Sequence, residues 1–565
     1  MVLQGKGAAP GAAVGQVYIY NEKFKKPKES FITSDQAQAH LDRYLSIKKE
    51  ALNELEELRL SLLKVDSSKA EIFNAQKEIV EDIIINEEIP ARIQNENWAG
   101  DWAIFQVYDT VLNVLKKTPD PLISERSADF DDVRSLLLRL WYGQKKEKLN
   151  ALTKPVIIAA DELMPSDIAS MDKNRVLAIL LEAGGVTSHA AIIAKGLGIP
   201  AVMCIPQLLD TVKQEQLAAV NAYEGTVILN PNEETVREYN EKRETFCQEK
   251  KETETFINSE GCTACGVKID IGLNITSADD SELEVSEYVD SVGVFRTEFI
   301  YMNRSTLPTE EEQFLMYKKV LECFGERPVI LRTLDIGGDK KLSSLELPRE
   351  ENPFLGNRAL RFCFSRPDVF KTQVRAALRA SFYGNLWLML PMVSSLDDIR
   401  KAKEFIAGAR KELEKEGKSL KEIKTGIMIE IPSVALIADK AAKEIDFASI
   451  GSNDLCQYVC AADRMNSAVE PYYQSFHPAM LRLIKETITA FNDAGKPISI
   501  CGELGSDIKA VPLLIGLGLR KISMSASSVA SVKRAIAGVT VEKAQETAKK
   551  ALELSTAQEI EQLLG

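Results

Sequence analysis

The sequence contains few histidines and no long apolar run. Its 565 residues include only three histidines, His40, His189 and His477, so histidine chemistry has few places in which to occur. A membrane-spanning helix needs roughly 18 consecutive apolar residues, and runs such as Val176–Leu181 are far too short. The segment Met1–Gly7 also lacks the apolar core of a signal peptide. We therefore expect a cytoplasmic protein without membrane insertion.

The sequence has no excess of basic residues and no regular pattern of cysteines. Lysine and arginine number 70 against 83 acidic residues, and the net charge of −13 argues against a general nucleic-acid or anionic-membrane binder. Nine cysteines scattered over so long a chain do not form a disulfide framework. The only Cys-x-x-Cys, Cys262–Cys265, has no second ligand pair nearby, so we expect no zinc site there.

What is present indicates a globular chain of about three or four domains. Residues 1–21 are rich in glycine and alanine and end in an alternating strand. Apolar runs at 155–160, 176–181 and 226–229 indicate further strands, with which we expect that first strand to pair. Between them, residues 33–141 carry leucines at helical spacing and predict an all-α insertion. Residues 232–257 are charged on every face, as in an exposed helix that connects two domains.

The remainder of the chain contains eight short apolar runs separated by helical stretches. These runs begin at Val267, Ser291, Val329, Leu386, Gly426, Phe447, Ile498 and Lys521. Eight strands that alternate with helices over about 300 residues predict a (β/α)8 TIM barrel. A doubly wound sheet is the structural alternative.

Charged and polar side chains follow several of these predicted strands. In a (β/α)8 barrel such positions meet at one rim, where the chemistry takes place. Arginines at that rim favour a phosphate or carboxylate ligand, and Glu430 with Asp454 would suit Mg²⁺. The strand-end residues are Arg296, Arg332, Lys340, Glu430, Asn453, Asp454 and Cys501, with Arg358 and Arg464 close to the same rim in the sequence.

A second group of residues surrounds His189. A predicted strand ends in Gly184-Gly185, and Thr187 or Ser188 can cap the helix that follows, which places His189 in the first helical turn. The positive end of a helix disfavours an imidazolium and favours an added anion. The segment therefore favours a phosphohistidine over a structural histidine.

Together these motifs resemble enzyme I of the phosphoenolpyruvate-dependent sugar phosphotransferase system over essentially the whole chain. The resemblance rests on Gly-Gly-x-Thr-Ser-His, which ends at His189, and on six motifs of the predicted barrel. Those six motifs begin at Arg296, Arg332, Glu351, Gly451, Ala461 and Ile500.

The resemblance implies an α/β protein with four regions. A swivelling phosphohistidine α/β domain would comprise residues 1–21 and 147–231. A helical subdomain that binds the carrier protein HPr would be inserted in it as residues 22–146. Residues 232–260 would form a helical linker, and residues 261–565 would form a TIM barrel that binds phosphoenolpyruvate (PEP) and dimerises.

The resemblance also implies the reaction of the phosphotransferase system. PEP would donate its phosphoryl group to Nε2 of His189, pyruvate would leave, and phosphohistidine would pass the group to HPr as the first step of sugar uptake. Glu430 and Asp454 would hold Mg²⁺, Cys501 would protonate the enolate of pyruvate, and Thr187 would support His189. Contacts to the substrate are expected from Arg296, Arg332, Lys340, Arg358, Asn453, Asp454 and Arg464.

Three positions depart from the family pattern, all of them in the phosphohistidine domain. Val186 and Lys195 stand where the family has arginine, and Glu162-Leu-Met-Pro-Ser166 stands for Asp-Leu-Thr-Pro-Ser. Valine cannot form the charge-assisted hydrogen bonds that an arginine could make to phosphohistidine. We therefore expect phospho-His189 to be less stabilised here than in relatives with arginine.

Other functions remain as alternatives. A pyruvate phosphate dikinase or PEP synthase would need an ATP-binding domain ahead of the histidine domain, and only a short strand precedes the helical region. A PEP-utilising barrel lyase would not need the motif at His189. A non-catalytic or regulatory phosphorelay scaffold would not need a complete barrel rim.

Overall fold

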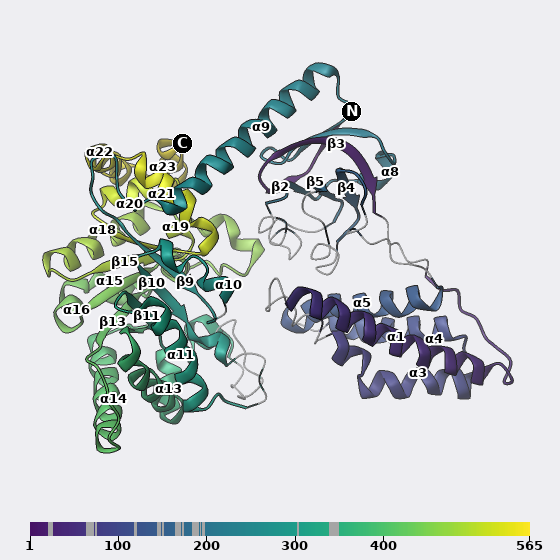
Figure 1. Ribbon diagram of the computed structural model, residues 1–565, viewed down its shortest axis with the longest axis horizontal. Coiled ribbons are helices and arrows are strands. Elements are labelled where there is room, and N and C mark those ends of the chain that lie inside the picture. The colour runs from purple at the N-terminus through teal and green to yellow at the C-terminus, as the bar shows by residue number, and fades with distance from the viewer. Residues whose placement is uncertain are drawn as a thin grey trace. The chain divides into compact units, whose positions relative to one another are not determined.

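The protein is described by a computed structural model that forms two compact units, residues 1–249 and 250–565 (Figure 1). Each unit is considered by itself. The structure describes the chain except for residues 21–25, 64–72, 74–75, 118–120, 144–148, 150–151, 164–170, 172–174, 184–190, 192–193, 195–197, 279, 302–303, 305 and 338–349.

The first unit contains an eight-stranded sheet with the order β1-β8-β7-β3-β4-β5-β6-β2. Its strands are β1 (Val2–Gln4), β2 (Lys6–Ala9), β3 (Ala12–Ile19), β4 (Val156–Ala160), β5 (Val176–Leu181), β6 (Ala201–Met203), β7 (Leu217–Asn221) and β8 (Thr226–Leu229). Strand β3 pairs with β4 in parallel and with β7 in antiparallel orientation. The expected pairing of the first strand with the later α/β strands is therefore confirmed.

The sheet curls until its two edge strands are neighbours in the sequence. Strands β1 and β2 occupy the two ends of the strand order, yet only Gly5 separates them. The amide of Gly5 donates to the carbonyl of Gly225 at 2.8 Å, next to the start of β8. Residues 2–9 therefore complete both edges of the sheet, one against β8 and the other against β6.

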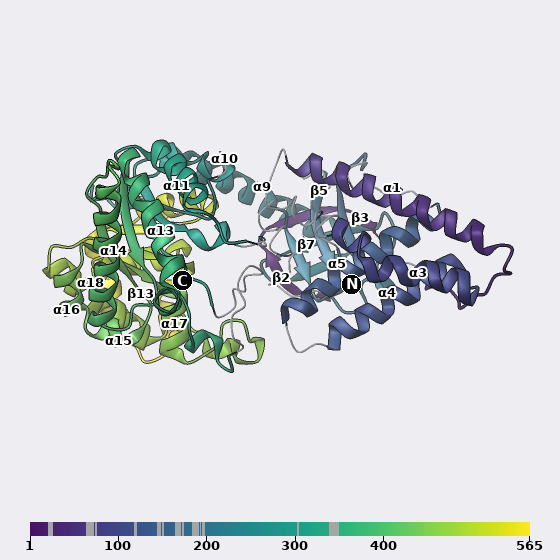
Figure 2. The same cartoon turned by 90° about the horizontal axis from the view of Figure 1, so that it is seen from below.

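Four long helices between β3 and β4 pack around their own core (Figure 2). They are α1 (Ala37–Leu63), α3 (Ile83–Glu96), α4 (Gly100–Lys117) and α5 (Pro121–Trp141). Helix α1 contacts α3 and α5, and α4 contacts the same two helices. Buried Tyr44, Ile89, Tyr108 and Leu138 come from the four different helices, so the block has a core separate from that of the sheet. The short helix α8 (Leu208–Thr211) follows β6.

The second unit is a closed barrel of eight parallel strands, as the sequence predicts. The strands are β9 (Asp270–Ile275), β10 (Ser291–Arg296), β11 (Pro328–Arg332), β12 (Asn385–Leu390), β13 (Lys424–Ile429), β14 (Phe447–Gly451), β15 (Ile498–Cys501) and β16 (Lys521–Met524). Pairing of β16 with β9 closes the barrel and excludes the doubly wound alternative. These strands are almost wholly buried, as expected of parallel strands covered by helices.

Helix α9 (Glu233–Thr255) crosses the boundary of the two units, and further helices surround the barrel (Figure 1). These are α10 (Asp280–Leu283), α11 (Glu310–Phe324), α12 (Leu360–Ser365), α13 (Pro367–Ala380), α14 (Leu396–Lys415), α15 (Pro432–Leu436), α16 (Ala438–Glu444), α17 (Ser452–Cys460), α18 (Pro478–Asp493), α19 (Glu503–Ser506), α20 (Ala510–Gly516), α21 (Val529–Ala537), α22 (Val541–Glu553) and α23 (Ala557–Leu564). Capping boxes start α11 and α14, where Thr309 pairs with Glu312 and Ser395 with Asp398.

Strand β9 begins three residues later than the apolar pattern indicates. Val267 belongs to a tight turn instead, in which its amide donates to the Thr263 hydroxyl at 3.0 Å. Cys262 pairs with Lys268 in an isolated bridge beside that turn. Local hydrogen bonds of the turn therefore replace the strand pairing that the apolar residues suggest.

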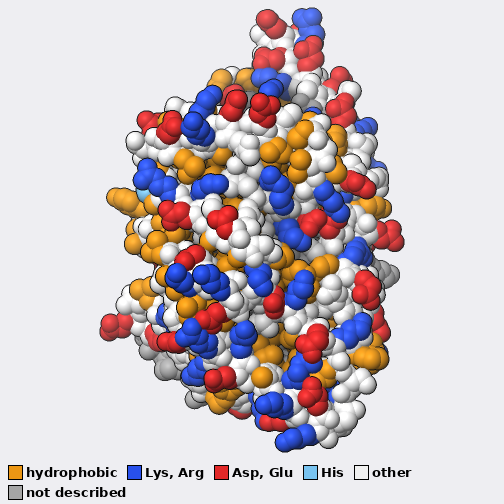
Figure 3. All heavy atoms as spheres, turned by 90° about the vertical axis from the view of Figure 1, so that its left-hand side faces the viewer, with side chains coloured by type: hydrophobic (Ala, Val, Ile, Leu, Met, Phe, Trp, Pro, Cys, Tyr) orange, Lys and Arg blue, Asp and Glu red, His pale blue; other side chains and the backbone are white. Residues whose placement is uncertain are grey.

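Side chains of both charges are interspersed on the face shown in Figure 3, with small apolar groups among them. On the barrel, Arg375 of α13 forms ion pairs with Glu310 of α11 at 2.7 Å and with Glu416, which follows α14, at 2.8 Å. Among the helices of the described residues, none is long and apolar enough to cross a membrane.

Candidate active site

The carboxyl ends of the barrel strands bring most of the predicted residues to one rim. Arg296 is the last residue of β10 and lies opposite Arg332, the last residue of β11, in the register of the two strands. Glu430 directly follows β13, and Cys501 is the last residue of β15. Because the parallel strands of a barrel end at the same rim, all four side chains start from that rim, those of Arg296 and Arg332 from neighbouring strands.

Arg332 is held by two carboxylates. Its Nη2 donates to Oε1 of Glu298, and its Nη1 lies 3.1 Å from Oδ2 of Asp335. Burial alone would lower the pKa of Arg332, but Glu298, Asp335 and Glu430 raise it above its usual value, so the guanidinium stays charged. Its buried Nε has no hydrogen-bond partner among the described residues and remains able to donate to a ligand.

Arg358 lies beneath the rim and is fully buried. Its Nε and Nη2 donate to the two oxygens of Asp335 at 2.9 and 3.1 Å. Its Nη1 and Nη2 donate to the two oxygens of Asp454 at 2.9 and 3.2 Å. The structure therefore shows Arg358 as a bridge between two carboxylates, at a position for which the sequence predicts a direct contact with a substrate.

Glu430 is a fully buried carboxyl beside other carboxylates. Its Oε1 accepts from the amide of Met392 at 2.5 Å, and Met392 has the left-handed φ of 53°. Burial and the charges of Asp454 and Asp335 raise the pKa of Glu430 to about 8. An uncompensated charge is costly in such a place, so without a cation the carboxyl is largely protonated at neutral pH.

The carboxyls of Glu430 and Asp454 fit the magnesium ion that the sequence predicts. Oε2 of Glu430 is buried and has no hydrogen-bond partner among the described residues. A side chain at Gly451 would place its Cβ 3.0 Å from this oxygen, so the glycine leaves the space beside it open. Arg358 lowers the pKa of Asp454, which keeps the second carboxyl charged although it is buried. Two carboxylates, with the remaining positions left to substrate and water, are a ligand set that Mg²⁺ accepts.

Within the described residues, no cluster of three or more His, Cys, Asp or Glu side chains forms a potential metal site. The expectation that Cys262 and Cys265 bind no zinc therefore stays a prediction.

Cys501 lies in the barrel interior with the apolar side chains of neighbouring strands. Its Sγ donates to the carbonyl of Ile450 at 3.5 Å. Burial raises the pKa of the Cys501 thiol, and the nearby charges of Arg296 and Arg332 oppose this effect. The net shift is upward, so the thiol keeps its proton at neutral pH and can donate it to a carbanion.

Asn453 is the second residue of helix α17 (Ser452–Cys460), next to the segment that follows Cys501. The amide of Glu503 donates to Oδ1 of Asn453 at 2.9 Å, and the hydroxyl of Ser452 donates to the carbonyl of Cys501 at 2.8 Å. Gly502 between them has a φ of 91°, and a Cβ there would meet the Ser452 hydroxyl at 2.4 Å. The contact of the two segments therefore depends on glycine at this position.

Arg464 comes from the chain that follows α17. Its Nη1 lies 3.8 Å from Oδ2 of Asp454, and its side chain is only 22% exposed. Its amide donates to Oε1 of Gln457 at 3.1 Å, which fixes the start of this segment to the helix.

Three predicted residues lie outside the described residues. These are His189 and Thr187, together with the rest of 184–190, and Lys340 within 338–349. Val186 and Lys195, which depart from the family pattern, lie outside them as well. Their expected roles stay predictions.

Glu298 and Asp335 belong to the motifs that begin at Arg296 and Arg332, and no role is predicted for either from the sequence. The structure shows that both hold arginines at the rim. Their positions, two residues after Arg296 and three after Arg332, were the available signal. Tyr458 is missed entirely, although its hydroxyl lies 3.4 Å from Nη1 of Arg358.

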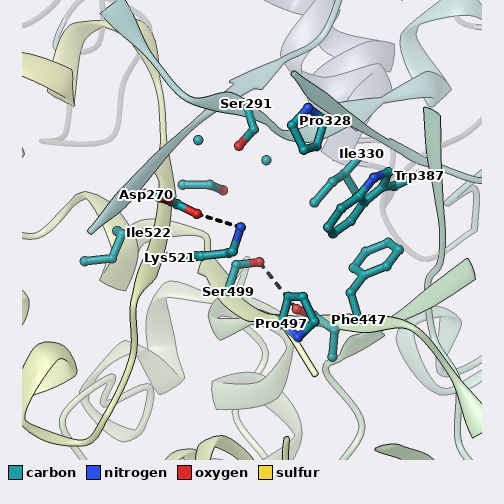
Figure 4. A pocket seen from close by; sticks show the side chains of 14 residues that line it. Asp270, Ser291, Pro328, Ile330, Trp387, Phe447, Pro497, Ser499, Lys521 and Ile522 are labelled. Carbon is teal, nitrogen blue, oxygen red and sulfur yellow. Dashed lines mark hydrogen bonds and ion pairs between the residues drawn. The ribbon is translucent and has the colours of Figure 1, made fainter. Parts of the chain in front are cut away.

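A separate small pocket lies at the opposite, amino-terminal end of the barrel (Figure 4). Asp270, Ser291 and Lys521, each the first residue of its strand, line it together with Trp387 and Phe447. Nζ of Lys521 lies 2.6 Å from Oδ2 of Asp270. None of the predicted site residues that the structure describes lines this pocket, and those at strand ends lie at the other end of the barrel.

Three family models match the chain. The PEP-utilising enzyme, PEP-binding domain matches residues 250–541, which include the barrel strands. The PEP-utilising enzyme, mobile domain matches residues 152–225, and the PEP-utilising enzyme, N-terminal model matches residues 4–126.

The chain is also similar to curated proteins along its whole length. It is 37% identical over 569 residues to the phosphoenolpyruvate-protein phosphotransferase of Staphylococcus aureus, covering 100% of this chain and 99% of that one. Identity to the protein of the same name from Staphylococcus carnosus is 38% over 564 residues, with 100% and 98% covered. For the Bacillus subtilis protein it is 37% over 560 residues, with 99% and 98% covered.

Proposed function

This chain belongs to the family of phosphoenolpyruvate-protein phosphotransferases, and from that premise we propose which of its residues carry out the reaction. The chain is an enzyme that takes the phosphoryl group of PEP and transfers it to protein in the sugar phosphotransferase system. The assignment of residues rests on the buried arginines and carboxylates at the barrel rim. Among the described residues, Nε of Arg332 and Oε2 of Glu430 have no hydrogen-bond partner there and are available to ligands.

PEP binds at this rim through its phosphate and carboxylate groups. Arg296 and Arg332 are adjacent cations at the ends of two strands, and the free Nε of Arg332 supplies a charge-assisted hydrogen bond. Asn453 lies on helix α17 and Arg464 follows the helix, and both approach the same rim. Lys340, expected from the sequence, adds a further cation for the phosphate.

Arg358 acts on the substrate indirectly. It holds Asp335, which positions Arg332, and Asp454, which neighbours Arg464. It is therefore a positioning residue, and four hydrogen bonds to the two carboxylates fix their orientation.

Glu430 and Asp454 would hold Mg²⁺. When bound, the ion would supply positive charge that offsets the charge of the transferring phosphoryl group and of the leaving enolate. Its binding requires Glu430 to lose the proton that burial otherwise retains on it.

His189 accepts the phosphoryl group on Nε2, and the bond from phosphorus to the enolate oxygen of PEP breaks. Cys501 then donates its proton to the enolate carbon, which yields pyruvate. The raised pKa of Cys501 supports this role because it keeps the thiol protonated. The phosphohistidine passes the group to HPr, which docks on the helical block.

The barrel forms a homodimer, and the enzyme works in the cytoplasm.

Incubation with Mg²⁺ and PEP labelled in its phosphoryl group tests this proposal. The wild-type protein should gain an acid-labile label, and His189→Ala should gain none. The matched control is His40→Ala, which removes a histidine of the helical block whose Nδ1 accepts from the amide of Gly100. Labelling of His189→Ala at the wild-type level would contradict the assignment of the acceptor.

A further inference from the structure

Helix α17, which contains Asn453 and Asp454, also carries two cysteines one turn apart, Cys456 and Cys460. The sulfur atoms of Cys456 and Cys460 are 4.0 Å apart, and Cys456 donates to Cys460. Cys456 is buried, whereas Cys460 is partly exposed and is the last residue of the helix. The mechanism proposed above uses neither thiol.

Cys460 is the reactive member of the pair. The hydrogen bond from Cys456, together with that from the backbone amide of Gln474, outweighs burial and lowers the pKa of Cys460 to about 6. A partly exposed thiolate is the form of cysteine that attacks hydroperoxides. Cys501, in contrast, is buried and its pKa is raised, so it stays a thiol and reacts slowly.

The helical spacing brings the two residues within reach of a disulfide, but not without strain. Helix geometry places Cα atoms four residues apart at about 6 Å, inside the 4.4–6.8 Å range of disulfides. Their Cβ atoms are roughly 5–6 Å apart on a helix, whereas a disulfide needs about 3.8 Å. The last turn must therefore rearrange, and it can do so because Ala461 already leaves the helix with a φ of 50°.

We propose that Cys456 and Cys460 form a peroxide-driven, reversible disulfide that inhibits the PEP site, an inference that rests on the function proposed above. The Cys460 thiolate attacks a hydroperoxide, the O–O bond breaks, and the products are a sulfenic acid and the corresponding alkoxide or hydroxide, which takes up a proton. Cys456 then attacks the sulfenic sulfur, the S–O bond breaks, and water leaves with the proton of the Cys456 thiol. Two thiols are oxidised and one hydroperoxide is reduced.

The rearranged turn reaches the active site through Gln457, which lies between the two cysteines. The carbonyl of Gln457 accepts from the amides of Ala461 and Ala462, and its side chain accepts from the amide of Arg464 at 3.1 Å. Closing the disulfide moves these acceptors and with them the backbone of Arg464. A displacement of about 1 Å at a substrate-binding group costs roughly 10²-fold in rate.

The same strain makes the disulfide reversible. Strained disulfides have more oxidising potentials and are readily reduced by thiols. Inhibition should therefore last only while peroxide is present in excess over thiol reductant.

The full-length protein tests the inference in two measurements. Reduced and peroxide-treated samples are compared in their initial rate of labelling by PEP and Mg²⁺, and in the mass of the peptide that contains residues 456–460. The same treatment is applied to the variants Cys456→Ala and Cys460→Ser, which leave all the proposed ligands in place. A third sample is treated with peroxide and then with dithiothreitol.

Peroxide should slow labelling of the wild type by about tenfold or more, and its peptide should become two hydrogens lighter. Dithiothreitol should reverse both effects, and neither variant should show them. The inference is wrong if the peptide keeps its mass, if its mass falls while the rate stays unchanged, or if the variants lose as much rate as the wild type. Failure of the reduced wild type to label would overturn the proposed function and with it the inhibition, while the peptide mass would still decide whether the disulfide forms.

Discussion

The carboxyl of Glu430 makes the stability of the magnesium-free protein depend on pH. Its pKa is about 8 in the folded chain and near 4.5 when the burial and the neighbouring carboxylates are removed. Between these values the folded state binds more protons than the unfolded state, so the free energy of unfolding should fall as pH rises. The slope attributable to Glu430 is at most about 1.4 kcal/mol per pH unit.

Urea unfolding at pH 5 to 8 in the presence of a chelator measures this slope. Glu430→Gln removes the titration but keeps the shape of the side chain, so its free energy of unfolding should fall less with pH than that of the wild type. Equal slopes in the two proteins would show that Glu430 does not titrate in this range.

Arg358 should matter for both stability and activity because its two carboxylate partners are buried with it. Arg358→Ala removes the cation that both carboxylates share and leaves Asp335 beside Arg332 and Asp454 beside Arg464. This should lower the free energy of unfolding by about 3–5 kcal/mol and reduce labelling by PEP. Arg358→Lys keeps the charge but cannot make the paired hydrogen bonds to both carboxylates, so it should be intermediate.

The control for Arg358 is Arg366→Ala. Arg366 pairs with Asp368 on the surface, where the two side chains are 40% and 62% exposed, and such pairs contribute about 0–1 kcal/mol. Chemical denaturation of the three variants measures their free energies of unfolding. If Arg358→Ala lowers this free energy as little as Arg366→Ala does, the stabilising role of the buried bridge is contradicted.

The sequence allows the strand-end residues of the site to be predicted, but not the bridge beneath them. Arg332 and Glu430 stand directly at the ends of apolar runs, so the barrel rule places them at the rim. Arg358 lies outside any strand, and its partners Asp335 and Asp454 are 23 and 96 residues away in the chain. No local sequence pattern indicates a contact between residues so far apart in the chain. The burial of Arg358 is therefore visible only in the three-dimensional structure.

At the scale of single elements, the junction of β15 and α19 depends on Gly502. Gly502→Ala combines an unfavourable φ with a clash against the Ser452 hydroxyl, and Oδ1 of Asn453 lies only 2.6 Å from the added Cβ. The variant should lose at least about 1 kcal/mol of stability and should label more slowly with PEP, because Asn453 is displaced.

Gly408→Ala is the matched control for this change. Gly408 is exposed in the middle of α14, and a Cβ there meets nothing within 4 Å. Alanine should therefore stabilise that helix by about 0.5–1 kcal/mol and leave labelling unchanged. If Gly502→Ala behaves as Gly408→Ala does, the close approach of Gly502 to Ser452 is unimportant.

The barrel strands were predictable as elements because each is a buried apolar run between polar segments. The start of β9 was not, because Val267 and Ile269 continue the apolar pattern of the strand while the hydroxyl of Thr263 draws the backbone of Val267 into a turn. The apolar pattern states which residues are buried, and hydrogen bonds decide which of them are paired as a strand.

At the scale of the whole molecule, the two compact units should divide the reaction. Every proposed PEP ligand lies in residues 250–565, whereas His189 lies in the other unit. A fragment of residues 1–258 should accept the phosphoryl group from phospho-HPr but not from PEP, and residues 250–565 should bind PEP without being labelled. Label on the first fragment from PEP alone would contradict this division.

The exact boundary residues of the domains predicted from the sequence stay predictions. The boundary between the two units falls within α9, between residues 249 and 250, inside the stretch 232–260 that the sequence predicts to be a linker. A charged helix has no apolar face to show where one unit ends and the next begins, so the sequence could define the linker but not a boundary residue.

The curled sheet has a consequence for synthesis of the chain. Val2 pairs with Ile228 and Lys6 with Met203, so residues 2–9 leave the ribosome roughly 10–45 s before their partners at about 5–20 residues per second. The four helices, which lie between, are complete earlier and have a core of their own. They can therefore fold while the first strands wait unpaired. The glycines and lysine of this waiting segment give it low β-propensity, which limits pairing with other nascent chains.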